Sequence, residues 1–219
     1  MIFEKEVDYI RKRETFMRRA RKEELEEIAT FIVERFEGLE QFMFLYKDFE
    51  NAKSVMKKVT ISELNLYFDK GDILIEDAGG LHAVIVAIKS TKFTFLNILL
   101  NSLKTQLYLS ELSKSDLVIL KEKMKLQNKL HNRKWFKRYC KDCYYITQIA
   151  ISKEKKGSGL FRKVITPILE ECQKNDICVV LETFTESNVS LYEYFGFKLV
   201  EIHTNDCVPL TEYCMIKEN

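Results

Sequence analysis

Glycine is scarce in this chain, accounting for 7 of 219 residues. The motif GxxxxGK(S/T) does not occur, and no stretch has the three glycines of GxGxxG. These absences exclude a Walker-type phosphate loop and a dinucleotide-binding fingerprint. A turn that uses two of the seven glycines is therefore conspicuous.

Long apolar runs are also missing, since no stretch of about eighteen apolar residues is available to span a bilayer. The first residues, MIFEKEVDYIRKRE, carry too many charges for a secretory signal. Six cysteines without an export signal indicate reduced thiols, not a disulfide framework. We expect a cytoplasmic protein with no membrane partner.

Charge of one sign is not in excess overall, because the net charge is only +2. Two segments are locally basic, Arg11–Lys22 and Lys121–Lys141. We interpret both as solvated faces and predict no nucleic-acid partner. The alternative is a nucleic-acid-binding protein that uses the second segment, where Trp135 and Phe136 would stack on bases.

Metal-ligand patterns are incomplete. Cys140 and Cys143 have the spacing of a zinc knuckle, but no second pair follows, and His82, His131 and His203 are scattered. The sequence therefore predicts no metal site.

The chain does contain alternating helical and strand patterns, typical of a single α/β domain over residues 1–219. Apolar residues recur at helical spacing in residues 22–37, and two further helical regions are predicted at residues 39–58 and 160–175. Strand patterns cover residues 14–20, 72–77, 81–89, 143–152 and 177–183, and a hairpin of residues 198–203 and 211–217 turns around Pro209. The strand at 143–152 is apolar on both faces, which indicates a position inside a covered sheet.

A helical segment over about Thr91 to Arg138 separates the third and fourth predicted strands. It divides into two helices near LSKSD, where Ser113 or Ser115 would cap the second helix. We interpret the aromatic pair at 135–136 as docking this insertion onto the domain.

The stretch Glu154–Phe161, EKKGSGLF, links a strand to a helix. Such a turn brings unpaired N–H groups and the positive end of the helix dipole to one place. Gly157 and Gly159 would let a phosphate approach the backbone, and Lys155 and Lys156 add positive charge. Taken alone, the stretch fits an ordinary helix-opening turn equally well.

The order of strand, KGSGLF turn, helix, strand VVLET and closing hairpin resembles the GNAT superfamily of acyl-CoA-dependent N-acetyltransferases. The pyrophosphate loop of that family, Gln/Arg-x-x-Gly-x-Gly/Ala, is placed on Lys156-Gly157-Ser158-Gly159-Leu160-Phe161. Here Lys156 keeps a cation and Phe161 replaces a small residue. The register from Glu154 to Gly159 restores the last glycine but starts on an acid, and we prefer the first register for its strand-to-loop spacing.

A second family signature is met in full. It is an asparagine followed by Leu-Tyr and Gly-Phe, at Asn188, Leu191, Tyr192, Gly196 and Phe197. The resemblance implies a mixed, mostly antiparallel central sheet flanked by helices, an α/β (α+β) fold with the helical insertion at about 91–138 as an elaboration.

The resemblance also implies a binding mode for acetyl-CoA, between the strands of residues 144–152 and 177–183. Its pantetheine arm would bond to the backbone near Ile149 and Ile151, its pyrophosphate would lie on the loop 156–161, and Asn188 would contact it from the other side. No metal takes part.

The implied reaction is direct attack of an amine on the thioester. Tyr192 would act as general acid toward the departing CoA thiolate. Glu182 is a candidate general base, with a structural hydrogen-bonding role as the alternative, and Gln148 is a candidate for positioning substrate.

The resemblance thus predicts transfer of an acetyl group from acetyl-CoA to a primary amine of a small molecule or peptide. The alternative is a non-catalytic acyl-CoA-binding sensor or partner module. Members of the family often dimerise, so a homodimer is open to this chain.

Overall fold

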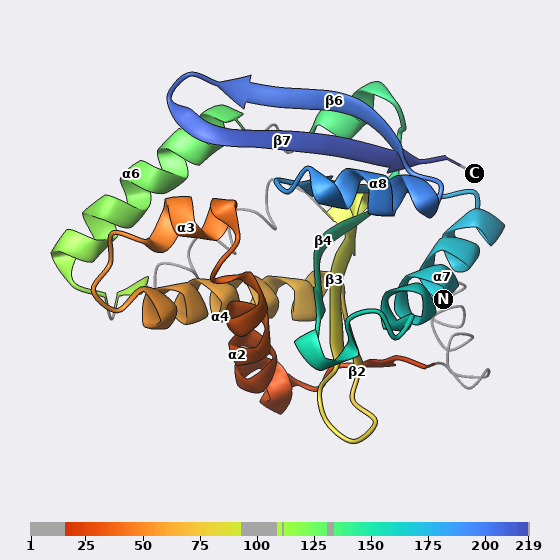
Figure 1. Ribbon diagram of the computed structural model, residues 1–219, viewed down its shortest axis with the longest axis horizontal. Coiled ribbons are helices and arrows are strands. Elements are labelled where there is room, and N and C mark those ends of the chain that lie inside the picture. The colour runs from red at the N-terminus through yellow and green to blue at the C-terminus, as the bar shows by residue number, and fades with distance from the viewer. Residues whose placement is uncertain (1–15, 93–108, 111, 131–133, 219) are drawn as a thin grey trace.

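One seven-stranded sheet of order β1-β2-β3-β4-β5-β7-β6 forms the centre of the computed structural model, which describes residues 16–92, 109–110, 112–130 and 134–218 (Figure 1). Neighbouring strands are antiparallel except β4 and β5, which are parallel. The strands are β1 (Arg18–Arg19), β2 (Asp72–Glu76), β3 (Ala83–Lys89), β4 (Cys143–Ile151), β5 (Cys178–Thr183), β6 (Lys198–Asn205) and β7 (Val208–Lys217).

Helices cover both faces of this sheet. The longer helices are α2 (Leu25–Phe36), α3 (Glu40–Tyr46), α4 (Ala52–Lys70), α6 (Lys114–Leu130), α7 (Leu160–Lys174) and α8 (Ser187–Tyr194). Short 3-10 turns are η2 (Lys22–Glu24), η3 (Ser90–Lys92), η4 (Trp135–Arg138) and η5 (Lys153–Lys155). In Figure 1, α2, α3 and α4 lie on one side of β3 and β4, and α7 lies on the other.

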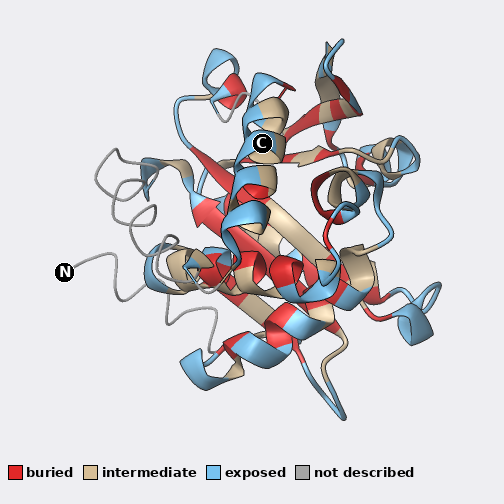
Figure 2. Ribbon diagram, turned by 90° about the vertical axis from the view of Figure 1, so that its left-hand side faces the viewer, coloured by how far each residue is buried: buried red, intermediate tan, exposed pale blue. Residues whose placement is uncertain are grey.

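Alternate residues of β3 supply the two halves of the core. Ile85 packs in the cluster with α7 and α8, whereas Val84 and Val86 pack in the cluster with α2 and α4. Figure 2 shows buried residues along the strands and on the inward sides of the helices. The central strands are buried on both faces, which confirms the prediction made for residues 143–152 from their apolar pattern.

The predicted mixed, mostly antiparallel sheet flanked by helices is confirmed, with three differences of detail. Residues 39–58, predicted as one helical region, form α3 and the first part of α4, which continues to Lys70. The closing hairpin turns at residues 206–207 and not around Pro209, which lies in β7. Pro209 is tolerated there because the β6–β7 register is irregular between Thr204 and Asn205. Of the strand predicted at 14–20, only Arg18–Arg19 forms a strand within the described residues.

The insertion joins β3 to β4 as predicted, although its residues 93–108 lie outside the described part. Ser113 caps α6, since its Oγ accepts a hydrogen bond from the Asp116 N–H at 3.1 Å. The Lys123 ammonium of α6 pairs with Asp48 at 2.7 Å. Trp135 is fully buried, and Phe136 nearly so, which confirms that these aromatics dock the insertion onto the domain.

All six cysteines are free thiols, as Cys207 at the surface and Cys214 in the core illustrate. Among the described helices, none pairs enough length with enough apolar character to traverse a lipid bilayer.

Candidate functional site

Strands β4 and β5 pair along only part of their length. In the described residues their parallel register runs from Cys143 opposite Cys178 to Ile146 opposite Leu181, and then stops. Beyond it, β4 stays paired with β3 up to Ile151. We call the separated part, residues 147–151 of β4 and 182–183 of β5, the strand fork.

A bulge in β4 begins at the strand fork. Ile146 pairs with Ala87 and Gln148 with Val86, so Thr147 is the extra residue. The Thr147 hydroxyl donates a hydrogen bond to the Val86 carbonyl at 3.1 Å, which holds the bulge against β3. A bulge bends its strand, and this one accounts for β4 leaving β5. The half-buried Ile149 and Ile151, predicted to bind pantetheine, both lie on the strand fork.

The glycine loop follows β4 directly through η5. Gly157 and Gly159 have φ of +79° and +78°, in the left-handed region that side chains other than glycine disfavour. A Cβ at either position would meet no atom within 4 Å, so the backbone conformation, and not crowding, requires glycine. The Ser158 hydroxyl closes the loop by donating to the Lys155 carbonyl at 2.7 Å.

Helix α7 starts at Leu160 with its amino end at this loop. The Leu160 N–H donates to Ser158 Oγ at 3.3 Å, and the Lys163 N–H donates to the Gly159 carbonyl at 3.1 Å. The N–H groups of a first helical turn have no intrahelical acceptor, and the helix dipole places positive potential there. With Lys155 and Lys156 exposed beside it, the loop can bind an anion.

Phe161 lies in the first turn of α7, not in the glycine loop. Its ring packs against Phe195 at a centroid distance of 5.2 Å and against Tyr192 at 6.1 Å. A bulky ring at this position therefore packs α7 against the C-terminal part of α8.

Tyr192, the predicted general acid, is a buried residue of α8. Besides Phe161, it contacts Phe197 with ring centroids 5.8 Å apart. Burial raises the pKa of Tyr192 to about 12, because the charged phenolate is less well solvated than in water.

Asn188 connects the start of α8 to the end of β5. Its side-chain amide donates a hydrogen bond to Thr183 Oγ1 at 3.2 Å, and the Thr185 N–H donates to the same oxygen at 3.2 Å. Thr183 was not singled out in the sequence, where it is simply the last residue of an apolar run. Thr183 accepts these hydrogen bonds only because α8 brings Asn188 back to the end of β5.

Glu182, the candidate base, points to the opposite sheet face from Thr183. Its carboxylate accepts hydrogen bonds from the Trp135 indole and the Tyr145 hydroxyl. Burial and the neighbouring carboxylate raise the pKa of Tyr145 well above its usual value. Glu182 is thus engaged by two aromatic donors, one of them from the insertion.

A second carboxylate approaches the strand fork from α4. The Gln148 side-chain amide donates to Glu63 Oε2 at 3.3 Å, and Glu63 is exposed. Sequence analysis missed Glu63 because it belongs to no motif, and only the packing of α4 brings it beside the bulge.

A pocket of about 400 Å³ opens at the tip of the β6–β7 hairpin. It is lined by the start of α3, the connection between β5 and α8, and the hairpin turn. Three carboxylates line it, those of Glu40, Glu186 and Asp206, together with Phe184 and Tyr213. None of the described residues around it is a lysine or arginine. The pocket can therefore accept a cationic group.

His203 lies in a polar cluster that the sequence did not reveal. Its Nδ1 is 2.9 Å from Glu212 Oε2 and its Nε2 is 2.6 Å from Glu201 Oε2. Burial works against charge on the ring, but the two carboxylates raise the pKa of His203 above its usual value. His82 is outside this cluster, and His131 lies outside the described residues.

Comparison with known proteins identifies the fold. No family model matches the chain. A segment of 79 residues is 33% identical to an uncharacterized N-acetyltransferase of Schizosaccharomyces pombe, covering 34% of this chain and 31% of that protein. The chain thus matches about a third of the length of this curated relative.

Solved structures match over almost the whole chain. An acetyltransferase from Corynebacterium glutamicum, described as histone acetyltransferase HPA2 and related acetyltransferase, aligns with a TM-score of 0.61 and 13% identity over 92% of this chain and 94% of its own. The mosquito arylalkylamine N-acetyltransferase-like 5b aligns with a TM-score of 0.60 and 11% identity over 93% and 99%. The chain therefore has the GNAT acetyltransferase fold.

The positive φ of the loop glycines predicts that alanine substitutions at Gly159 and at Gly38 will differ in their effect on the free energy of unfolding. Gly159→Ala should lower the free energy of unfolding by about 1 kcal/mol, since alanine is strained at positive φ. Gly38→Ala adds a methyl group that also meets nothing within 4 Å, without the positive φ, and should be neutral or slightly stabilising. Urea unfolding of both variants measures the difference, and equal effects would contradict the backbone argument.

Proposed function

We propose that this chain is an N-acetyltransferase that transfers the acetyl group of acetyl-CoA to a primary amine of a small molecule or peptide. The observation that carries the proposal is the placement of the strand fork, the glycine loop at the start of α7, and the buried Tyr192 of α8 on adjacent elements of one GNAT fold. None of the three would suffice alone.

The residues present suit acetyl-CoA as a co-substrate. The first-turn N–H groups of α7 and the loop of Gly157 and Gly159 provide donors for a pyrophosphate. The backbone of Ile149 and Ile151, beyond the last β4–β5 pair, would bind the pantetheine amides, and Asn188 would contact the arm from α8.

We further propose that the family's loop motif occupies Glu154–Gly159 and not Lys156–Phe161. Both positive-φ glycines then take the two small positions, and the helix starts immediately after the second. In this register Phe161 is a helix residue whose bulk packs on Tyr192 and Phe195. Its N–H belongs to the donors of the first turn, as does that of Arg162.

In the proposed reaction the amine nitrogen attacks the thioester carbonyl carbon. A C–N bond forms, the C–S bond breaks, and the CoA thiolate takes the Tyr192 hydroxyl proton. Donation from a buried hydroxyl stabilises charge on sulfur as it develops, which is where it lowers the barrier.

The proton lost by the amine requires an acceptor. Glu182 already accepts hydrogen bonds from Trp135 and Tyr145, so we assign it to holding these rings. Glu63 lies within hydrogen-bond distance of Gln148 at the bulge and is exposed. We propose Glu63 as the general base, acting directly or through a water molecule.

Replacing the general acid tests the chemistry. Tyr192→Phe keeps the ring and should lower kcat by about 100-fold or more, while acetyl-CoA affinity stays nearly unchanged. Thiol release with a panel of amines measures turnover, and thermal stabilisation by acetyl-CoA measures binding. Unaltered kcat would remove Tyr192 from the mechanism. Binding without thiol release for any amine would instead favour the non-catalytic acyl-CoA sensor.

Replacing each of the two carboxylates separates their roles. Glu63→Gln should lower kcat by about 100-fold or more, because an amide cannot accept the proton that the amine loses. Glu182→Gln should lower the melting temperature and leave kcat nearly unchanged, as thermal melting and thiol release would measure. The reverse pattern would restore Glu182 as the base.

The acceptor is proposed to be a cationic amine that reaches the strand fork through the carboxylate-lined pocket. The names of the two solved relatives refer to histones and to arylalkylamines, which both carry amino groups. In this chain Glu40, Glu186 and Asp206 add negative charge at the pocket. They favour an acceptor with a second positive charge over one with an acidic group.

Neutralising the pocket tests this acceptor class. The double variant Glu186→Gln with Asp206→Asn should raise KM for diamines at least several-fold, leave kcat little changed, and weaken the salt dependence of kcat/KM. Glu193→Gln, on α8 and outside the pocket, is the matched control and should have no effect. Equal use of diamines and acidic amines by the parent protein would contradict the assignment.

A further inference from the structure

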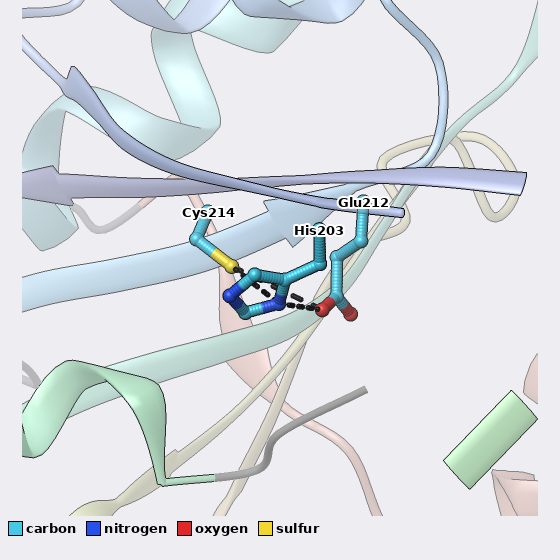
Figure 3. A group of neighbouring side chains, drawn as sticks. All are labelled: His203, Glu212 and Cys214. Atoms are coloured by element: carbon cyan, nitrogen blue, oxygen red, sulfur yellow. Dashed lines mark hydrogen bonds and ion pairs between the residues drawn. The ribbon is translucent and has the colours of Figure 1, made fainter. Parts of the chain in front are cut away.

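Three potential metal ligands gather on one face of the β6–β7 hairpin. His203 and Glu212 are direct cross-strand partners, and Cys214 lies two residues beyond Glu212 on the same face. Figure 3 shows the three side chains pointing toward one another beneath the two strands. Their donor atoms all lie within 4.8 Å of one another.

The distances are close to those of a tetrahedral ion site. His203 Nδ1 is 2.9 Å from Glu212 Oε2 and 3.8 Å from Cys214 Sγ, and the sulfur is 4.0 Å from the same oxygen. Zinc bond lengths at tetrahedral angles place such atoms about 3.4–3.6 Å apart. Shifts of about half an ångström would bring the three donors to equal reach of one ion.

The donor set selects the kind of ion. One imidazole nitrogen, one carboxylate oxygen and one thiolate sulfur are the ligands that zinc uses in proteins. Calcium and magnesium prefer oxygen alone, so they are disfavoured here. Three protein ligands leave a coordination position for water, and the side chain of His203 is 19% exposed, which gives solvent a route to the cluster.

The residues around His203 hold its ring in the orientation that a metal ligand needs. His203 Nε2 bonds to Glu201 at 2.6 Å, and Arg138 of η4 holds Glu201, with its Nε donating to Oε1 at 2.8 Å. A carboxylate on the far ring nitrogen fixes the ring and directs the other nitrogen to the ion. Arg138 belongs to the insertion, so the insertion supports the cluster from outside.

The charges of the cluster can be balanced by a dication. Glu212 and Cys214 are both fully buried, and a thiolate with a carboxylate would offset the two charges of zinc. Glu201 is already paired with Arg138. Without an ion, a protonated His203 paired with Glu212 would balance the charge of the same site. The zinc-bound site and the ion pair therefore predict different results when Zn²⁺ is added.

We propose that His203, Glu212 and Cys214 form a binding site for Zn²⁺. On binding, bonds form from the metal to the three donors, and the protons of the Cys214 thiol and of the imidazole Nδ1 leave to solvent. The site ties β6 to β7 next to η4 and does not depend on the acetyl-transfer reaction.

The test uses the full chain after removal of metals with a chelator. Zn²⁺ added alone should bind at one ion per chain and raise the melting temperature, because it binds the folded state. Co²⁺ should give a thiolate-to-metal charge-transfer band, which requires a cysteine ligand. Cys214→Ser and His203→Gln should each weaken Zn²⁺ affinity at least tenfold and abolish or shift the band.

Matched controls identify the ligands. Cys207→Ser and Cys140→Ser change thiols outside the cluster, and His82→Gln changes a histidine outside it, so all three should bind as the parent does. Absence of the cobalt band in the parent protein would overturn the proposal without any variant and would favour the His203–Glu212 ion pair. Retention of full affinity in the folded Cys214→Ser variant would overturn it as well.

Discussion

The arrangement of the site depends on where the pairing of β4 with β5 stops. Backbone groups inside a sheet are normally paired, so two parallel neighbours separate only where something interrupts the ladder. In this chain the interruption is the extra residue Thr147, anchored to Val86 of β3. With β4 kept on β3, β5 continues with β7, and the two halves of the sheet diverge from a single point.

Much of the fold follows from local pattern. The continuous apolar character of residues 143–152 predicted a strand buried on both faces, and the helical spacing of residues 22–37 predicted α2, because burial imposes these periods directly. The hairpin turn was misplaced because proline usually marks a turn, whereas Pro209 lies at a register irregularity of β7. Local composition does not reveal such an irregularity, which arises from the pairing of two strands.

The candidate site divides in the same way. Gly157 and Gly159 were recognisable because their conformation is set by neighbours along the chain, and Tyr192 because it stands within a signature of nearby residues. Glu63, Thr183 and the cluster at His203 were not recognisable, since their partners are distant in sequence or on another strand. Residues on different elements come into contact only through tertiary packing. A single sequence does not show which of them will be in contact.

The chain contains a single tryptophan, and its position has a practical consequence. Trp135 is fully buried at the end of the insertion, and its indole N–H is bonded to Glu182 where β5 leaves β4. When excitation is chosen so that tyrosine does not absorb, the fluorescence of the unmodified protein therefore originates from one side chain at that junction. Its emission wavelength and its accessibility to quenchers report whether the end of the insertion remains packed against the diverging strands.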